Sequence, residues 1–124
     1  MALVNRIEKR VKMGKAGIIK YQLLTYCYVN NIKNISDSDL NCLTYLALEG
    51  DQELTTFCNK AFAKKIFSSV QSVRNSLTKA ERKNLIIKEG KNKKKIYINP
   101  NMLVQTKGNI FLDYKFLSVE TTQS

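Results

Sequence analysis

Residues 54–100 read LTTFCNKAFAKKIFSSVQSVRNSLTKAERKNLIIKEGKNKKKIYINP, and this stretch decides the fold. Its first third has apolar residues at helical spacing, and a second helical pattern follows after a short break. The last third has two β-branched and aromatic runs on either side of a lysine-rich turn. The stretch therefore predicts a short helix, a tight turn, a second helix and a basic β-hairpin.

The second predicted helix has two unlike faces. Ser68 or Ser69 is its expected N-cap, because a serine oxygen accepts hydrogen bonds from the free amides of a first turn. One face is apolar, with residues at spacings of three, four and three, namely Val70, Val73, Leu77 and Ala80. Only Glu81 is acidic on the remaining surface, whereas an ordinary surface helix usually pairs Glu with Lys there.

The polar face of this helix has side chains that suit DNA bases. Asn and Gln can donate and accept at one base edge, and Arg can hold guanine with two donors. We therefore predict base contacts from Ser69, Gln71, Ser72, Arg74, Asn75 and Thr78. A plain amphipathic surface helix is the alternative.

The predicted hairpin has a cluster of cations at its turn. Residues 85–87 and 96–98 are the strands, and residues 88–95 between them contain five lysines, with Gly90 and Asn92 as turn residues. Lysines in such a cluster can contact phosphates without reading sequence. The predicted phosphate contacts are Lys79, Arg82, Lys88, Lys91, Lys93, Lys94 and Lys95. The alternative is a solvated hairpin whose lysines protect a sheet edge.

The order of these elements resembles the winged helix-turn-helix proteins of bacteria, plasmids and phages. The resemblance depends on SSVQSVRNSL at residues 68–77, on the Leu85-Ile86 pair and on YINPNM at residues 97–102. The last motif is most similar to the RepL family of plasmid replication proteins, whose wing also ends near an Asn-Pro. The resemblance covers roughly residues 36–103 and implies a fixed angle for the DNA-reading helix.

The expected fold is mainly α with a small β part, built as a helical bundle plus a basic β-hairpin wing. N-terminal helices and a C-terminal hairpin are expected to flank it. The predicted divisions are a helical extension at 1–35, a winged helix-turn-helix domain at 36–103, and a strand and tail at 104–124.

Charge is unevenly distributed along the chain, whose formal net charge is +11. Residues 60–95 hold twelve Lys or Arg and two acids, whereas residues 21–59 hold one lysine and five acids. The basic pole thus coincides with the predicted DNA element, which favours double-stranded DNA as the partner. A membrane surface is disfavoured as a partner, because no segment joins a basic face to large exposed apolar side chains.

The segments before this stretch are predicted to be helical. In residues 3–12, Val4, Ile7 and Val11 share a helical stripe, which could be a basic arm on DNA, a helix packed on a partner subunit or a plain surface helix. Residues 18–29 are apolar nearly all round and predict a buried helix, with a strand as the alternative.

Two further helices are expected to support the reading helix. Ser36 is the expected cap of the first, with Asp37 and Asp39 as helix-start acids rather than a metal-binding pair, and Gly50 ends it. The core stripe of this helix is expected at Leu40, Leu43 and Ala47, with Leu46 beside it. Thr55 or Thr56 is expected to cap the next helix, with Phe57, Ala61 and Phe62 facing inward.

Residues after Pro100 predict a second hairpin. Ile110, Leu112, Tyr114 and Phe116 alternate with other residues, and residues 107–109 form a predicted turn between two strands. A short hairpin with one apolar face needs a surface to cover it. We therefore predict a homodimer or higher oligomer, with Leu112 or Tyr114 near the contact, and a frayed tail at residues 121–124.

Catalytic and metal-binding motifs are lacking. The chain has no histidine, so Ser-His and Cys-His nucleophile pairs and the usual zinc sites are excluded. Three cysteines in apolar settings, with no Cys-x-x-Cys, are typical of reduced core thiols in a cytosolic protein. Five scattered glycines make no phosphate-binding loop. We expect no enzyme activity, no cofactor, no signal peptide and no membrane span.

Two functions follow from these patterns. The first is a sequence-specific double-stranded DNA-binding protein, a transcription regulator or replication factor of a bacterium, plasmid or phage, associated with the nucleoid in the cytoplasm. The second is a phage structural or DNA-packaging component that reuses a winged-helix fold for assembly. Its partners would be other phage structural proteins, and its place would be the virion.

Overall fold

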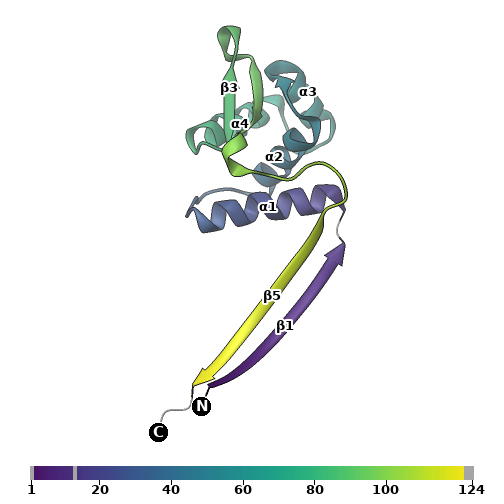
Figure 1. The fold of residues 1–124 in the computed structure, drawn as a ribbon. Coiled ribbons are helices and arrows are strands. Elements are labelled where there is room, and N and C mark those ends of the chain that lie inside the picture. The colour runs from purple at the N-terminus through teal and green to yellow at the C-terminus, as the bar shows by residue number, and fades with distance from the viewer. Residues whose placement is uncertain (1, 13, 122–124) are drawn as a thin grey trace.

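The computed structural model describes residues 2–12 and 14–121, with side chains for 14–111, 113, 115, 117 and 118. The elements follow in the order β1 (Ala2–Lys12), α1 (Lys15–Val29), α2 (Asp37–Glu49), β2 (Gln52–Glu53), α3 (Leu54–Ala63), α4 (Val70–Arg82), β3 (Ile86–Glu89), η1 (Lys91–Lys93), β4 (Lys95–Ile98), η2 (Pro100–Met102) and β5 (Phe111–Thr121). Residues 15–102 form a helical body with a small sheet, and β1 and β5 form a separate terminal ribbon (Figure 1). The mainly helical fold with a small antiparallel part is confirmed.

Helix α1 lies across one end of the body. The predicted helix at 18–29 is confirmed and the strand alternative is excluded. One side of α1 is buried against the core through Ile19, Leu23 and Cys27, but Tyr28 on the other side is 86% exposed. The apolar character of the helix all round therefore does not mean burial all round in a single chain.

Helix α2 begins and ends as its sequence predicts. The Ser36 side chain accepts from the Asp39 backbone, and the Asp39 side chain accepts from the Ser36 backbone, which is a complete capping box. Gly50 ends the helix at φ 77°, a conformation that glycine adopts without strain. Leu40, Leu43 and Leu46 are buried, whereas Ala47 only packs at the core's margin.

Two expectations for α3 are wrong. Its N-cap is Glu53, whose carboxylate accepts from the Thr55 and Thr56 amides, so neither threonine is the cap. Phe57 and Ala61 are buried as expected, but Phe62 is 45% exposed. The reason is geometric, because position 62 lies about 140° around a helix from position 57.

Helix α4 and the small sheet complete the core. Ser69 caps α4, and Val73, Leu77 and Ala80 are buried, with Val70 at the margin. The β3–β4 hairpin is confirmed, and β2 adds a third strand in the antiparallel order β2-β4-β3. Two residues of β2 are too few for a sequence pattern to reveal. Gly90, at φ 84°, makes the sharp exit from β3.

The core contains all three cysteines. Cys27, Cys42 and Cys58 are buried free thiols among leucines and Phe57, as the sequence predicts for reduced core residues. In the part of the chain that the structure describes, no helix combines the length and the apolar character needed to cross a bilayer.

The terminal ribbon corrects the predictions for both chain ends. Residues 3–12 belong to strand β1 instead of a helix, and β5 pairs with β1 instead of forming a C-terminal hairpin. The antiparallel register runs from Ala2 opposite Thr121 to Lys12 opposite Phe111. The helix prediction for residues 3–12 was wrong because Ile7 and Val11 fit the alternation of a strand as well as the spacing of a helix. The partner strand β5 is about a hundred residues away, so no local pattern reveals the pairing.

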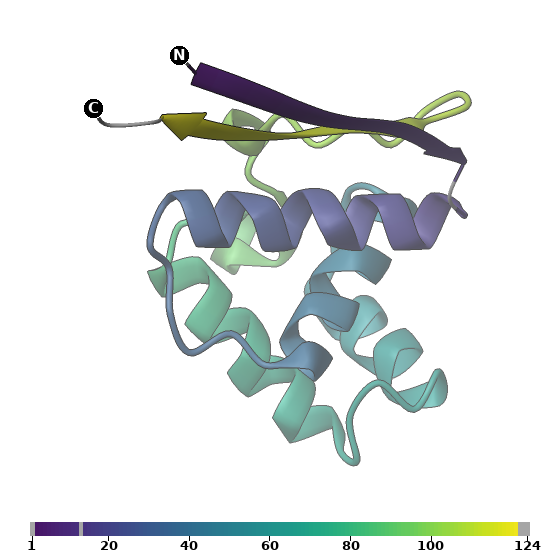
Figure 2. The same ribbon diagram turned by 90° about the horizontal axis from the view of Figure 1, so that it is seen from below.

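The ribbon leaves the body near the N-terminal end of α1 and slants away from it (Figure 1). Seen from below, the ribbon and α1 have roughly the same direction in projection (Figure 2), although the ribbon moves away from the helix along its length (Figure 1). Thr121 is the last residue of β5, and the rest of the predicted frayed tail lies outside the described residues.

Candidate nucleic-acid interface

The outward face of α4 has a pair of amide side chains. Gln71 and Asn75 are exposed one helical turn apart, and Gln71 Nε2 donates to Asn75 Oδ1 at 2.9 Å. Gln71 Oε1 and Asn75 Nδ2 have no hydrogen bond within the described part of the chain. The pair therefore presents one acceptor and one donor side by side, the combination that an adenine edge requires. Arg82 is exposed at the C-terminal end of the same helix.

Arg74 lies beside this pair but has a structural contact. Its Nη2 donates to Thr55 Oγ1 at 3.2 Å, which joins α4 to the first turn of α3. A guanidinium has five N–H donors, so this single bond leaves others for a ligand. Arg74 is half-buried, and the contact holds it at a fixed position next to the amide pair.

The other three predicted base readers have hydrogen-bond partners within α4 and its N-cap. Ser69 Oγ accepts from the Ser72 amide at 3.0 Å, and the two hydroxyl oxygens lie 2.9 Å apart. Thr78 Oγ1 donates to the Arg74 carbonyl oxygen at 3.0 Å. These three side chains are half-buried. Of the six predicted readers, the structure therefore brings Gln71, Asn75 and Arg74 together on the accessible surface.

A buried carboxylate fixes α4 against α2. Asp39 is 5% exposed and accepts from the Ser36 amide at 2.9 Å and from Ser76 Oγ at 2.7 Å. It also forms an ion pair with Lys79. Burial raises the pKa of Asp39, but the hydrogen bonds from Lys79, Ser76 and Ser36 outweigh it and hold the pKa below its ordinary value. The orientation of α4 is thus tied to the start of α2.

The contact between Asp39 and α4 does not follow from the sequence pattern. The sequence predicts Asp39 only as a helix-start acid, which its capping box confirms. The one signal that could have revealed the contact is Ser76, a polar residue directly beside the apolar stripe of α4. In the described residues, no three His, Cys, Asp or Glu side chains are grouped as metal ligands.

Three of the predicted phosphate contacts are held in ion pairs. Lys79 pairs with Asp39, and Lys88 Nζ lies 3.7 Å from Glu81 Oε1 with its side chain only 14% exposed. Lys95 Nζ lies between two carboxylates. A phosphate would have to compete with these carboxylates for the three lysines, so their role as phosphate contacts stays a prediction.

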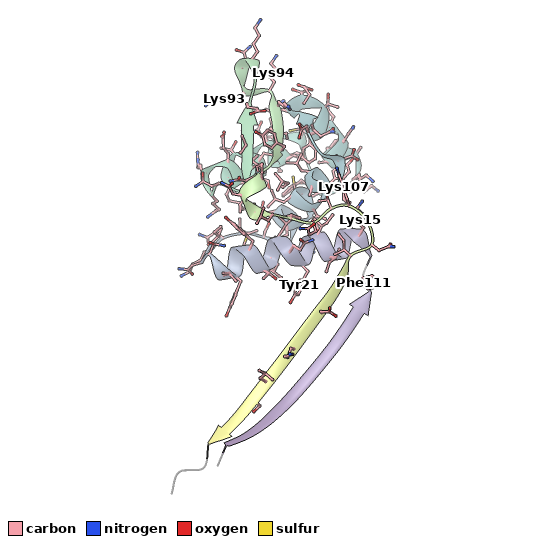
Figure 3. The ribbon with its side chains drawn as sticks, in the orientation of Figure 1. Lys15, Tyr21, Lys93, Lys94, Lys107 and Phe111 are labelled. Atoms are coloured by element: carbon pink, nitrogen blue, oxygen red, sulfur yellow. The ribbon has the colours of Figure 1, made fainter. Side chains whose placement is uncertain are left out.

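The remaining predicted phosphate contacts are accessible. Arg82, Lys91, Lys93 and Lys94 are exposed, and none forms an ion pair with a described residue. Lys91, Lys93 and Lys94 lie in residues 90–94, the hairpin tip, which projects from the body with Lys93 and Lys94 at its end (Figure 3). The tip is therefore the most accessible group of cations in the predicted set.

The base of the hairpin is anchored to β2. Lys95 Nζ lies 3.2 Å from Asp51 Oδ2 and 3.6 Å from Glu89 Oε1. The hydrogen bond to Asp51 raises the pKa of Lys95, with a smaller effect from Glu89. Tyr97 donates to Glu89 Oε2 at 2.9 Å, and that bond raises the pKa of Tyr97. The acids near the base leave the positive charge concentrated at the tip.

The turn before α4 adds two cations that are not among the predicted phosphate contacts. Lys65 is exposed at φ 61°, and Lys64 Nζ lies 5.2 Å from the centre of the Tyr45 ring. The only feature of the sequence that could have pointed to these two lysines is their position between the two predicted helices of residues 54–100. They extend the accessible positive charge toward the N-terminal end of α4.

The buried thiols do not form a reactive site. Burial is the main cause that raises the pKa of Cys42, to about 12, and burial also raises the pKa values of Cys27 and Cys58. A thiol with such a pKa is protonated at neutral pH and is a poor nucleophile.

Comparison of the chain with protein-family models, with curated proteins and with solved structures finds no match.

Proposed function

We propose that the chain is a sequence-specific double-stranded DNA-binding protein that reads bases with α4 and holds phosphates with the hairpin tip. The observation that carries this proposal is the exposed amide pair of Gln71 and Asn75 on a helix flanked by exposed cations that form no ion pair with a described residue. Side-chain amides in this arrangement suit a base edge, and cations around it suit the phosphates on either side.

The order of elements in the body supports a winged helix-turn-helix. Three helices, α2, α3 and α4, are followed by a two-stranded hairpin, and the short strand β2 between the first two helices joins that hairpin's sheet. In such a module the third helix enters the major groove and the hairpin lies over the backbone. The thirteen residues of α4 span roughly 20 Å, which is long enough to follow a groove about 12 Å wide.

The proposed role is a transcription regulator or replication factor of a bacterium, plasmid or phage. The resemblance of residues 97–102 to RepL proteins favours replication, and the helix surface alone suits either role. In both cases the protein would act at DNA in the nucleoid-containing cytoplasm.

Selection from a random duplex library tests the proposal. We expect the chain to enrich a motif and to bind the selected duplex at least tenfold more tightly than a scrambled one. Asn75→Ala should cost ~1–3 kcal/mol on the selected duplex and little on the scrambled one. Asn109→Ala is the matched control, because Asn109 is exposed in the loop before β5 and lies outside the proposed interface. No enrichment at low salt would refute sequence-specific binding.

The terminal ribbon favours a second candidate, a phage structural or DNA-packaging component. A long ribbon that projects from a small body is suited to assembly, and a lysine-rich tip could contact packaged DNA without reading it. The same assay separates the two candidates. Binding that depends on the hairpin tip but not on Asn75, with no enriched motif, would favour the structural role and a place in the virion.

A further inference from the structure

The three cations of α4 differ in what holds them. Lys79 pairs with the buried carboxylate of Asp39, and Arg82 forms no ion pair with a described residue. Arg74 differs from both, because its Nη2 donates to the Thr55 hydroxyl at 3.2 Å and no described carboxylate pairs with it. A hydroxyl partner restricts the side chain without neutralising its charge. Arg74 is therefore oriented and still fully able to bind an electron-rich acceptor.

The carboxylate at the start of α3 has other partners. Glu53 Oε1 accepts from the Thr55 amide at 3.2 Å, and Glu53 Oε2 accepts from the Thr56 amide at 2.8 Å and from the Thr56 hydroxyl at 2.6 Å. These bonds make Glu53 the N-cap of α3. The Thr55 hydroxyl is thus the group of this first turn that accepts from Arg74.

Thr55 is held at a fixed point because the residues before it belong to the small sheet. Strand β2 pairs with β4, and the Leu54 amide donates to the Lys94 carbonyl oxygen at 2.6 Å. Lys94 belongs to the hairpin tip, which projects from the body (Figure 3). The support of Arg74 is therefore continuous with the element that we propose to hold phosphates.

Arg74 lies on the α3 side of the amide pair. Three residues along the helix from Gln71, it is rotated by about 60° around the helix axis. Burial raises the pKa of the Cys58 thiol in α3, and the charge of Arg74 partly offsets this effect, in keeping with a guanidinium that lies close to α3. Residues three apart on a helix have Cβ atoms about 5–6 Å apart, whereas adjacent base pairs are about 3.4 Å apart. Arg74 can therefore reach a base within two base pairs of the one that the amide pair contacts.

We propose that Arg74 binds a guanine within two base pairs of an adenine held by Gln71 and Asn75, and that Thr55 is the positioning residue for Arg74. The bond to Thr55 uses one of the five guanidinium donors, and the O6 and N7 acceptors of guanine require two more. A side chain that is already oriented loses less conformational freedom on binding, so part of the preference for guanine depends on the Thr55 hydroxyl. This inference rests on the proposed function and specifies its DNA target.

Selection with single variants locates the two bases. Asn75→Ala should relax the motif at an adenine, and Arg74→Ala should relax it at a guanine within two base pairs of that adenine. Wild type should bind the selected duplex roughly 5- to 150-fold more tightly than a duplex with A·T at the guanine position. A guanine analogue with carbon in place of N7 should weaken binding by wild type but not by Arg74→Ala.

Variants of Thr55 test the positioning role. Thr55→Val removes the hydroxyl and should reduce the preference for guanine over adenine at the Arg74 position by roughly two- to tenfold. Thr55→Ser retains a hydroxyl and should restore that preference. The preference at the position of Asn75 should not change. In the Arg74→Ala background, Thr55→Val should have no further effect on either preference, because no guanidinium remains to be oriented.

Thr56→Val is the matched control. Thr56 is exposed in the same turn, but its hydroxyl donates to Glu53 and does not contact Arg74. The control should keep the wild-type preference for guanine, and circular dichroism should show the same helical content in both threonine variants.

The possible failures are distinguishable. An equal loss of guanine preference in the two threonine variants, or no loss in Thr55→Val, overturns the positioning role. A motif that Arg74→Ala relaxes at no guanine, or only at one farther than two base pairs from the adenine, overturns the inference and leaves the proposed function standing. If wild type enriches no motif, both are refuted.

Discussion

Asp39 is the residue that joins the start of α2 to the middle of α4. Its carboxylate receives the Ser36 amide, the Ser76 hydroxyl and the Lys79 ammonium in a buried setting. We expect Asp39→Asn to lower the free energy of unfolding by about 2–3 kcal/mol, because it removes a charged acceptor and leaves partners unsatisfied. The loss should be smaller than that for a fully buried ion pair, because the Lys79 side chain is 38% exposed and can reach water.

Urea denaturation at neutral pH measures this effect, and Asp37→Asn is the matched control. Asp37 lies in the same first turn and pairs with Lys20, but its side chain is 76% exposed. Only a small change is expected there, because solvent screens such a pair. Equal losses in the two variants would contradict the role assigned to Asp39.

The same residue predicts a dependence of stability on pH. The pKa of Asp39 is lower in the folded state than its value of about 4 in the unfolded state. Ionised Asp39 therefore stabilises the fold above pH ~4, and this stabilisation is lost as the pH falls through the pKa of the folded state. The difference in stability between wild type and Asp39→Asn should therefore narrow as the pH falls from about 5 to 3. Asp37 and Glu53 also have lowered pKa values, but they are present in both proteins. A difference that stays constant with pH would contradict this prediction.

Single residues were predictable where their partners are local. Ser36 and Ser69 were identified as possible caps because a cap bonds to amides two or three positions away. Gln71 and Asn75 were placed on the outer face by helical period alone. The ion pair of Lys79 with Asp39 could not be predicted, because the two residues are forty positions apart in the sequence.

At the scale of elements, the hairpin tip should contribute affinity without selectivity. Lys93→Ala with Lys94→Ala removes two exposed cations, so binding to selected and scrambled duplexes should weaken alike. The slope of log affinity against log salt should become shallower by about 2. Fluorescence anisotropy at several salt concentrations measures both effects.

Lys15→Ala with Lys107→Ala is the control for this variant. It removes the same charge near the N-terminal end of α1, on the far side of the helical body from the hairpin tip (Figure 3). The control should retain most of the wild-type affinity and slope. If the two double variants lose affinity equally, net charge governs binding and the tip has no special role.

Elements were predictable where their pattern is local and strong. The spacing of apolar residues and the capping residues predict the four α-helices of the described chain, and the turn residues predict the β3–β4 hairpin. The terminal ribbon was not predicted, because β1 acquires its structure from pairing with β5 at the other end of the chain. Strand β2 was also missed, since its two residues pair with a strand that comes after two intervening helices.

At the scale of the whole molecule, internal ion pairing reduces the charge available to the proposed DNA partner. Three lysines of the predicted set are paired with acids of α2, the β2 region and α4. The accessible cations near the proposed interface are Lys64, Lys65, Arg82, Lys91, Lys93 and Lys94. Six phosphate contacts predict a slope of log affinity against log salt of about −5 for duplex DNA. Titrations between ~50 and ~200 mM salt measure it, and a slope near zero would exclude phosphate contacts as the source of affinity.

The three buried cysteines allow local unfolding of the chain to be measured by thiol labelling, with no added probe. Cys27, Cys42 and Cys58 lie on α1, α2 and α3, and each is closed to solvent in the folded state. A thiol reagent can therefore modify each one only during the moments when its helix separates from the core. If α1 detaches alone, Cys27 will be labelled well before the other two. If the body opens only as a unit, mass spectrometry will find chains with no label or with three.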